Sequence, residues 1–244
     1  MSPSDQDRRQ QLVQAIFNRI AGRYDFLNRV ISFHFDTFWR KKAVHALMLR
    51  DAAPWVLDLG TGTGDLAATA AKEIKAGRIV GLDFSLEMLR LAQEKKRRNP
   101  SLGDRTFYIL GSALAPPFKN GAFDAVITAF VLRNIADLNL FFSHAYRLLK
   151  PGGQLVSLDM FPPSGAPFSF FYSFYFYRLV PWIGAALARD RSAYQYLSNS
   201  VRTFAAPEVI AELIEQAGFV KIKIRKFLRG AVCLHLGKKP GATK

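Results

Sequence analysis

The stretch Asp58-Leu59-Gly60-Thr61-Gly62-Thr63-Gly64-Asp65 decides how this chain folds. A short apolar run, residues 55–59, leads into it, and an alanine-rich segment follows it. Alternating glycines let a backbone turn sharply and approach a ligand closely. An apolar run, a glycine loop and an alanine-rich segment in this order predict a strand, a ligand-binding loop and a helix.

The alternation of strands and helices continues after the loop. Further strands are predicted at residues 78–83, 107–110, 123–130 and 154–160. A helical stripe from Leu138 to Leu149 ends at Pro151-Gly152-Gly153. Near the end of the chain, residues 220–225 alternate apolar and basic side chains, and residues 231–236 form another apolar run. We therefore predict an α/β fold with a seven-stranded, mostly parallel, doubly wound sheet that ends in an antiparallel hairpin.

The residues around the loop favour one cofactor over another. Asp83 ends the second predicted strand, where a carboxylate can accept hydrogen bonds from the ribose hydroxyls of an adenosine ligand. Dinucleotide-binding loops read G-x-G-x-x-G, whereas here the third glycine comes one residue early and Asp58 and Asp65 flank the loop. Carboxylates repel a pyrophosphate but attract an ammonium and a sulfonium. The pattern favours S-adenosylmethionine over a nicotinamide dinucleotide.

Composition excludes several classes of protein. Of the 244 residues, 50% are hydrophobic and 22% are charged, so a large core can form and wholesale disorder is excluded. A single cysteine excludes a disulfide scaffold and a thiolate-rich zinc site. The four histidines show no metal-ligand spacing, so we expect no metal. No charged-then-apolar leader opens the sequence, which predicts a cytoplasmic location.

The charge balance points to an anionic partner. Lys and Arg number 34 and Asp and Glu 19, which gives a formal net charge of +15. Such a surface favours nucleic acid, anionic lipid or an anionic substrate. The simpler interpretation is that the charge serves solubility and that lysines protect the edge strand from pairing with other chains.

Two segments complete the predicted domain, which spans residues 1–244. Residues 1–50 are predicted to form a helical cap, and residues 161–205 an aromatic insertion. Charge and proline interrupt the insertion before it reaches the roughly 20 apolar residues of a membrane span. The sequence leaves three interpretations of the insertion open: an interior helix, a lid over an apolar ligand, or a surface that inserts into a bilayer. Four aromatic residues would share one helical face: Phe168, Phe171, Tyr172 and Tyr175.

Motifs outside the glycine loop follow one another in a recognisable order. Residues 17–28 read F-x-x-I-A-x-x-Y-D-x-x-N, and Leu149-Lys150-Pro151-Gly152-Gly153 follows the helical stripe. The other motifs are Trp39-Arg40-Lys41, Leu132-Arg133-Asn134, Tyr194-Gln195-Tyr196-Leu197 and Ala217-Gly218-Phe219. Together they resemble the menaquinone and ubiquinone biosynthesis C-methyltransferases, and the resemblance spans nearly the whole chain. The terminal hairpin likewise resembles that of class I S-adenosylmethionine-dependent methyltransferases.

The resemblance implies a set of cofactor residues. With the loop, they are Asp58, Gly60, Gly62, Thr63, Gly64, Asp83, Ser112 and Ala113. Three positions depart from the family's pattern. Ala129 stands in place of a cofactor-contacting serine, Val131 in place of a glycine, and Asp159 in place of a glutamate. These departures lie on the expected substrate side, so they bear on the quinone more than on the methyl donor.

The implied reaction moves a methyl group from a sulfonium to a ring carbon, which attacks well only after the neighbouring hydroxyl loses its proton. Arg133 is the candidate for stabilising that oxygen, because a guanidinium stays charged and donates in a fixed fork. Asn134 would orient the same oxygen, and Tyr24 would hydrogen-bond the ring. The alternatives are that Arg133 pairs with a structural carboxylate and that Tyr24 only closes the pocket. His235 and water are open as proton acceptors, with a core histidine the simpler interpretation.

Several functions are compatible with these observations. The first is S-adenosylmethionine-dependent C-methylation of a prenylated quinol, above all demethylmenaquinol to menaquinol, with a ubiquinone-branch benzoquinol as the alternative ring. RNA methylation is a second, although the aromatic segment is not interleaved with Lys or Arg as nucleic-acid platforms are. A non-catalytic, lipid-binding member of the fold is a third, and a nicotinamide oxidoreductase comes last.

The first function implies particular partners. We expect a lipid quinol as substrate and an anionic membrane surface as a docking partner, with the protein held peripherally on the inner face of the membrane. No specific nucleic acid is expected. Whether the chain forms a homodimer is left open by the sequence.

Overall fold

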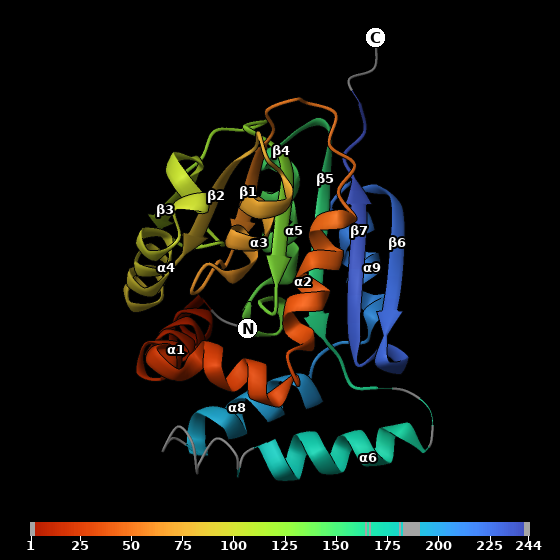
Figure 1. The fold of residues 1–244 in the computed structure, drawn as a ribbon. Helices are drawn as coiled ribbons and strands as arrows, with labels where there is room; N and C mark the ends of the chain where they lie inside the picture. Colours follow the sequence, from red (N-terminus) through yellow and green to blue (C-terminus); the bar gives the residue numbers. More distant parts are fainter. Residues whose placement is uncertain (1–2, 164, 166, 181, 183–190, 242–244) are drawn as a thin grey trace.

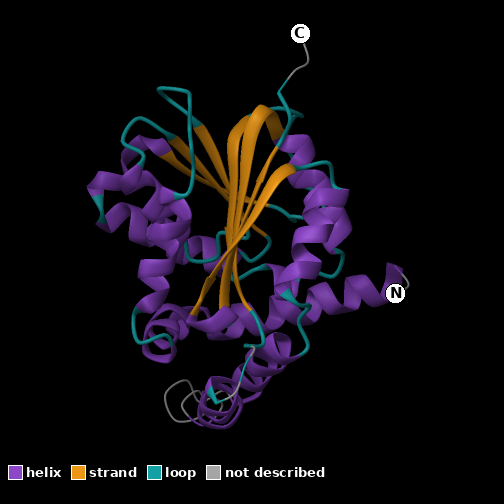
Figure 2. Ribbon diagram, turned by 90° about the vertical axis from the view of Figure 1, so that its right-hand side faces the viewer, coloured by secondary structure: helices purple, strands orange, loops and turns teal. Residues whose placement is uncertain are grey.

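A computed structural model describes residues 3–163, 165, 167–180, 182 and 191–241. One twisted sheet lies between two layers of helices, and a further group of helices covers one end (Figures 1 and 2). The strands are β1 (Trp55–Leu59), β2 (Arg78–Asp83), β3 (Thr106–Leu110), β4 (Phe123–Ala129), β5 (Leu149–Met160), β6 (Val220–Phe227) and β7 (Val232–Lys238). The α-helices are α1 (Pro3–Ile31), α2 (Phe35–His45), α3 (Asp65–Glu73), α4 (Leu86–Arg98), α5 (Leu138–Leu148), α6 (Phe168–Phe174), α8 (Arg191–Arg202) and α9 (Pro207–Gln216). Shorter helical segments are η1 (Pro100–Arg105), η2 (Leu132–Asn134), the π-helical η3 (Tyr175–Leu179) and η4 (Leu228–Gly230).

The sheet confirms the predicted topology. Its strand order is β3-β2-β1-β4-β5-β7-β6. Neighbouring strands from β3 to β5 run parallel, whereas β7 is antiparallel to both β5 and β6. The chain moves outward from β1 to β3 and then crosses back to β4. This places a topological switch point between β1 and β4, which is where doubly wound sheets bind ligands.

Each face of the sheet has its own core. Small residues of α3, such as Ala67 and Ala70, are fully buried and let that helix approach the sheet closely. On the other face, Phe141 and Phe142 of α5 are fully buried together with Ile210 of α9. Figure 2 shows the two helical layers on either side of the strands. Packing on both faces holds the sheet in place, and with it the carboxyl ends of the parallel strands.

The remaining helices cover that carboxyl edge. Figure 1 shows α1, α8 and α6 below the ends of the parallel strands. They share an apolar cluster in which Leu27 of α1 packs with Phe176 of η3 and Val201 of α8. The segments before β1 and after β5 therefore meet at one end of the sheet, although they are far apart in the sequence.

Two expectations need correction. The fifth strand begins at Leu149 rather than residue 154, because Leu149 pairs with Phe123 across a register shift and residues 150–153 continue the strand. An interior helix is excluded for α6, which has no buried residue and exposes 71% of Phe170. Within the predicted 161–205 insertion, residues 183–190 lie outside the described residues. No helix in the described parts of the chain is both long and apolar enough to cross a bilayer.

Candidate cofactor and substrate site

Two adjoining cavities lie at the carboxyl edge of the sheet. The first is lined by the loop after β1, the ends of β2 and β4 and one side of α1. The second lies between α2, α6 and the turn that joins α1 to α2. Tyr24, Arg40 and Phe130 line both cavities. The arrangement can hold two ligands that meet at these three side chains.

The glycine loop needs its glycines for two different reasons. Gly60 has a φ of +75°, and a Cβ built on it would lie 2.7 Å from both Cγ atoms of Val131. Val131, one of the departures from the family pattern, therefore packs directly on the loop and lines the first cavity. Gly64 lines neither cavity, and its contact with the cofactor stays a prediction. Its φ is +80°, and an added Cβ would lie 2.5 Å from the hydroxyl of Tyr108.

Asp83 is held in place by the backbone. Its Oδ2 accepts the N–H of Gly62 at 2.7 Å, and its Oδ1 accepts the N–H of Ser85 at 2.9 Å. Burial raises the pKa of Asp83, while these backbone hydrogen bonds act against the increase. Each carboxylate oxygen retains a further lone pair, and Asp83 lines the first cavity. This geometry suits the expected pair of ribose hydroxyls.

Asp58 fits the cationic end of the expected cofactor. It is 1% exposed, lines the first cavity and accepts the hydroxyl of Thr61 at 2.7 Å through Oδ2. Its Oδ1 is buried and has no hydrogen-bond partner. Burial raises the pKa of Asp58 to about 7, although the bond from Thr61 and the charge of Arg40 oppose that increase. An unpartnered carboxylate oxygen beside the cavity is the group that an ammonium would satisfy.

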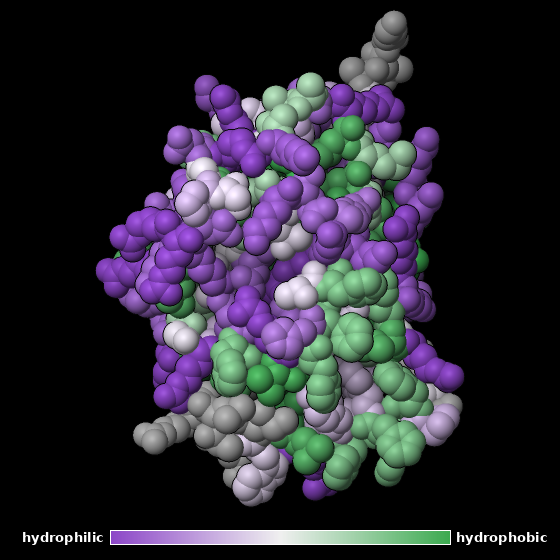
Figure 3. Space-filling view, viewed as in Figure 1, coloured by the Kyte–Doolittle hydropathy of each residue, from purple (hydrophilic) through white to green (hydrophobic). Residues whose placement is uncertain are grey.

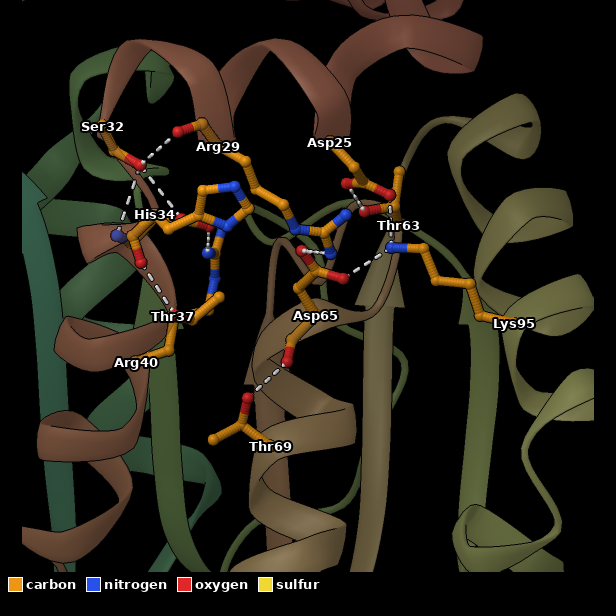
Figure 4. Close-up of polar contacts among 11 residues, drawn as sticks. Asp25, Arg29, Ser32, His34, Thr37, Arg40, Thr63, Asp65, Thr69 and Lys95 are labelled. Carbon is orange, nitrogen blue, oxygen red and sulfur yellow. Dashed lines mark hydrogen bonds and ion pairs between the residues drawn. The ribbon is translucent and has the colours of Figure 1, made fainter.

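The N-terminal helix is fastened to the glycine loop by charge. Thr63 lines the first cavity, and its hydroxyl donates to Asp25 of α1 at 2.5 Å. Lys95 of α4 pairs with both Asp25 and Asp65. Figure 4 shows Lys95 reaching both carboxylates, with Arg29 directed at Asp65 from the other side at 3.6 Å. Thr63 thus positions α1 as well as facing the cofactor cavity.

The other predicted cofactor residues lie together. The first cavity is also lined by Gly60, Gly62, Ser112 and Ala113. Asn134 lines the same cavity rather than the second one, and its Oδ1 accepts the hydroxyl of Tyr196 at 3.2 Å. All the predicted cofactor residues except Gly64 thus line one cavity, and their contacts with the cofactor stay predictions.

Aromatic side chains build the second cavity. The four residues predicted to share a helical face, Phe168, Phe171, Tyr172 and Tyr175, all line it. The hydroxyl of Tyr172 is buried without a hydrogen-bond partner, and burial raises the pKa of this phenol. The cavity is therefore apolar, with few polar groups to orient a ring.

Arg133 lies in a buried ion pair. Its Nη1 donates to Oδ1 of Asp159 at 2.5 Å, with 3% and 0% of the two side chains exposed. Pairing with a structural carboxylate, the alternative considered for this residue, is therefore present. Arg133 also lines the second cavity, so the pair does not remove it from the substrate side. Asp159, where the family has glutamate, keeps a carboxylate in this place.

His235 is a core residue and not a proton acceptor for the substrate. It is fully buried and lines neither cavity. Its Nε2 lies 2.9 Å from the carbonyl oxygen of Pro207, and burial lowers the pKa of the ring. The simpler of the two interpretations of this histidine is correct.

Tyr24 keeps its proton in this setting. Burial raises the pKa of the phenol, and the nearby guanidinium groups of Arg133 and Arg40 act in the opposite direction. A neutral phenol at the border of both cavities can donate a hydrogen bond to either ligand. Its predicted place beside the ring is consistent with this geometry.

Sequence reasoning missed Arg40 and Phe130 as members of the site. Arg40 is 6% exposed, and its guanidinium lies over the ring of Phe130 with 5.1 Å to the centroid. In the sequence, Arg40 was marked only by the Trp39-Arg40-Lys41 motif and by an aspartate four residues before it on the same helix. Phe130 follows β4 directly, which is a position that often faces a ligand in doubly wound folds.

Comparison with known proteins identifies the family to which the sequence is similar. The model of the ubiE/COQ5 methyltransferase family matches residues 5–239. A demethylmenaquinone methyltransferase of Thermus thermophilus is 41% identical over 226 residues, which cover 92% of this chain and 100% of that protein. A ubiquinone/menaquinone biosynthesis C-methyltransferase of Desulfotalea psychrophila is 39% identical and covers 93% of this chain and 90% of its own length.

A solved structure shares the fold. Phosphoethanolamine N-methyltransferase 2 of Haemonchus contortus, in complex with S-adenosyl-L-methionine, superposes with a TM-score of 0.61 at 19% identity. The match covers 83% of this chain and 52% of that one, so this chain spans about half of that protein. The fold, the cofactor cavity and the match over nearly the full length of the sequence lead to one conclusion: the chain belongs to the ubiE/COQ5 methyltransferase family.

Proposed function

We propose that this methyltransferase transfers a methyl group from S-adenosylmethionine to a ring carbon of a prenylated quinol, converting demethylmenaquinol to menaquinol. One observation carries the proposal: a polar cavity at the switch point adjoins an apolar, aromatic cavity, and the two share Tyr24, Arg40 and Phe130. A cationic cofactor suits the first cavity and a flat, apolar ring suits the second. The names of the two relatives support the same substrate class.

The first cavity holds the cofactor through groups of this chain. Asp83 would accept the ribose hydroxyls, and Asp58 the ammonium, while Gly60 and Gly62 allow the backbone to come close. When bound, S-adenosylmethionine supplies an electrophilic methyl group on a sulfonium. The three shared side chains then exclude water from the border between the two cavities.

The second cavity positions the ring. Arg133 would donate to one ring oxygen, and Tyr24, which keeps its proton, to the ring from the side of the cofactor. α6 and η3 act as the lid of this cavity, with Phe168, Phe171 and Tyr175 against the ring. Among the described residues, Asp36 is the one carboxylate that lines the second cavity, and it is paired with Arg40, so water takes the ring proton.

Methyl transfer from labelled S-adenosylmethionine tests the function directly. The acceptors are a short-tailed demethylmenaquinol, a demethyl benzoquinol and an unmodified transfer RNA, each offered under reducing conditions. Labelling of the naphthoquinol supports the proposal, and labelling of the benzoquinol alone moves the substrate to the ubiquinone branch. Labelling of RNA alone would contradict the proposal and assign the +15 charge to nucleic acid.

Cofactor affinity should rise with pH through the range in which Asp58 ionises. Burial raises the pKa of Asp58 to about 7. Between its unfolded value of about 4 and this folded value, the native state holds a proton that the unfolded state has lost, so the contribution of Asp58 to stability falls as pH rises. A bound ammonium favours the carboxylate, so binding below pH 7 releases this proton. Affinity should increase by up to about tenfold per pH unit up to pH 7.

Calorimetry at pH 5.5 and 7, in buffers with different ionisation enthalpies, measures both the affinity and the released proton. Asp58→Asn is the matched control, because it removes this titrating group and leaves the titration of Asp83 and of the cofactor's own amino group. Equal pH dependence of the wild type and the variant would show that Asp58 does not face the ammonium.

An exposed apolar surface surrounds the mouth of the second cavity. Apolar side chains gather over the lower part of the molecule, where α6 and the turn between α1 and α2 lie (Figure 3). We call this the aromatic patch, and its most exposed members are Phe33, Phe35, Phe170, Phe171, Phe174 and Trp182. A prenylated substrate is dissolved in a bilayer, and the net charge of +15 favours anionic lipid. The proposed function therefore includes peripheral docking of the aromatic patch on an anionic membrane.

The protein should float with vesicles that contain anionic phospholipid at low salt and leave them largely at high salt. Each basic residue near the surface contributes roughly 1 kcal/mol of attraction, which salt screens. Phe170→Ser with Phe174→Ser should lower the bound fraction, because both rings are exposed and line neither cavity. Met48→Ser is the control, since Met48 is 77% exposed and lies away from the aromatic patch, where its N–H donates to Gln154 of β5 near the start of β4. Absence of binding at low salt would contradict the docking proposal.

A further inference from the structure

The border between the two cavities fixes where the chemistry occurs. Of the residues that the structure describes, only Tyr24, Arg40 and Phe130 line both cavities. The ring carbon that receives a methyl group must face the cofactor cavity, so it lies at this border. The oxygen that activates this carbon is bonded to the neighbouring ring carbon, and it therefore lies at the border too. Among the three shared side chains, only Arg40 carries a positive charge.

Arg40 is held rigidly in this place. It lies on α2, is 6% exposed and donates through Nη1 to Oδ2 of Asp36. Asp36 is fixed in turn by the hydroxyl of Ser32 at 3.0 Å. Burial acts to lower the pKa of Arg40, but the carboxylates of Asp65 and Asp36 outweigh it and raise that pKa, so the guanidinium stays charged.

Phe130 presents its ring to two arginines. The guanidinium carbon of Arg40 lies 5.1 Å from the ring centroid, and that of Arg133 lies 6.0 Å from it. Phe130 has a φ of +63°, in the left-handed region that side chains other than glycine seldom adopt. Its N–H donates to the carbonyl oxygen of Leu158 at 2.8 Å, which holds this conformation. Such strain is often kept where a functional side chain must point in one direction.

The two arginines differ in what they can reach. Arg133 lines the second cavity alone and is committed to Asp159 at 2.5 Å. Arg40 lines both cavities, and a guanidinium offers five donors, of which the bond to Asp36 uses one. A quinol carries two oxygens on opposite sides of its ring, so both cations can be used.

We propose that Arg40 is a catalytic residue that holds the ionised quinol oxygen beside the reacting carbon, while Arg133 serves the opposite oxygen. The proposal rests on the quinol methyltransferase function and adds a residue to it. The hydroxyl proton passes to water, and the oxygen's electron pair feeds the ring. The ring carbon forms the new carbon–carbon bond as the methyl–sulfur bond breaks with its pair on sulfur. The ring C–H proton then leaves to water and aromaticity returns.

The role of Arg40 is to make the quinol hydroxyl more acidic. A cation in contact with a hydroxyl lowers its pKa by about 1–3 units. Other ionisable groups face Arg40 and must be separated from this effect: Asp36 on α2, Asp65 on α3, Asp58 on β1 and Tyr24 on α1. Of these, Asp58 ionises near neutral pH, but its titration cannot depend on which quinol is bound.

The test is the turnover of Arg40→Gln with a series of demethyl naphthoquinols of increasing acidity, made by halogenation of the distal ring, at saturating cofactor. With the least acidic quinol at pH 7, the variant should lose about 10- to 1,000-fold. The loss should shrink toward none for a quinol that ionises below the assay pH. Arg40→Lys keeps the charge, and its turnover should follow quinol acidity as the wild type does.

Equal loss of turnover for every quinol in the series would overturn the role of Arg40. Arg40→Gln leaves Asp36 unpaired. If this variant fails to fold, the double variant Asp36→Asn with Arg40→Gln removes both charges, and its turnover is measured with the same series of quinols. An unfolding midpoint near that of the wild type verifies the fold of each variant. A wild type that methylates none of the quinols is a failure of the proposed function instead, and that outcome is visible before any variant is made.

Discussion

Replacing Arg133 with alanine is expected to lower the free energy of unfolding by about 3–5 kcal/mol. Arg133 and Asp159 expose 3% and 0% of their side chains and are joined at 2.5 Å. Without the guanidinium, Asp159 becomes a buried carboxylate with no countercharge. Denaturant unfolding, followed by circular dichroism, measures this loss. Turnover of the folded fraction should also fall, because Arg133 lines the substrate cavity, whereas affinity for the cofactor should change little.

Two controls separate the pair from the chemistry. Arg90→Ala removes an exposed pair with Glu87 and should cost at most about 1 kcal/mol. Arg133→Met with Asp159→Leu replaces both charges by apolar groups and should recover most of the stability. If Arg133 also serves the ring, this double variant remains impaired in turnover although it is stable. A loss below about 1 kcal/mol for Arg133→Ala would contradict the buried pair.

The part of the site made from neighbouring residues could be predicted from the sequence. A strand, a glycine loop and a helix bring residues 58–65 to one edge of the sheet, and parallel pairing with β2 brings Asp83 beside them. The sequence does not show, however, that Gly64 packs closely against Tyr108 of β3, which lies behind the loop. A glycine needed for close packing and a glycine needed for a ligand have the same local pattern.

Residues that reach the site through tertiary packing could not be predicted. Arg40 faces both cavities because α2 packs against α3 and the end of β4, and no local pattern encodes that position. The four-residue spacing of Asp36 and Arg40 suggests only an exposed helical pair, whereas both are buried. Asp25 likewise joins the network only because α1 folds back over the glycine loop and meets Lys95.

The methyl acceptor is expected to be the reduced quinol, with essentially no transfer to the quinone. An oxidised ring is electron-poor, and its carbonyl oxygens have no proton to lose, so no electron pair is released to the ring carbon. Hydrogen bonds from Arg133 to a carbonyl would withdraw further electron density from the ring, because a guanidinium stabilises negative charge on oxygen. The aromatic cavity accommodates either oxidation state by shape, so the difference must appear in the rate of transfer and not in binding alone.

Labelled S-adenosylmethionine is therefore offered with a short-tailed demethylmenaquinone, with and without dithionite. Label should enter the ring only in the reduced sample, and a competition experiment should show that the quinone still occupies the site and inhibits. Dithionite with the already reduced quinol controls for damage to the protein. Equal labelling of both forms would contradict activation through an ionised oxygen, and with it the roles of Arg133 and Arg40. If the cofactor binds tightly but neither the quinone nor the quinol is labelled, the second cavity must accept a molecule other than demethylmenaquinol.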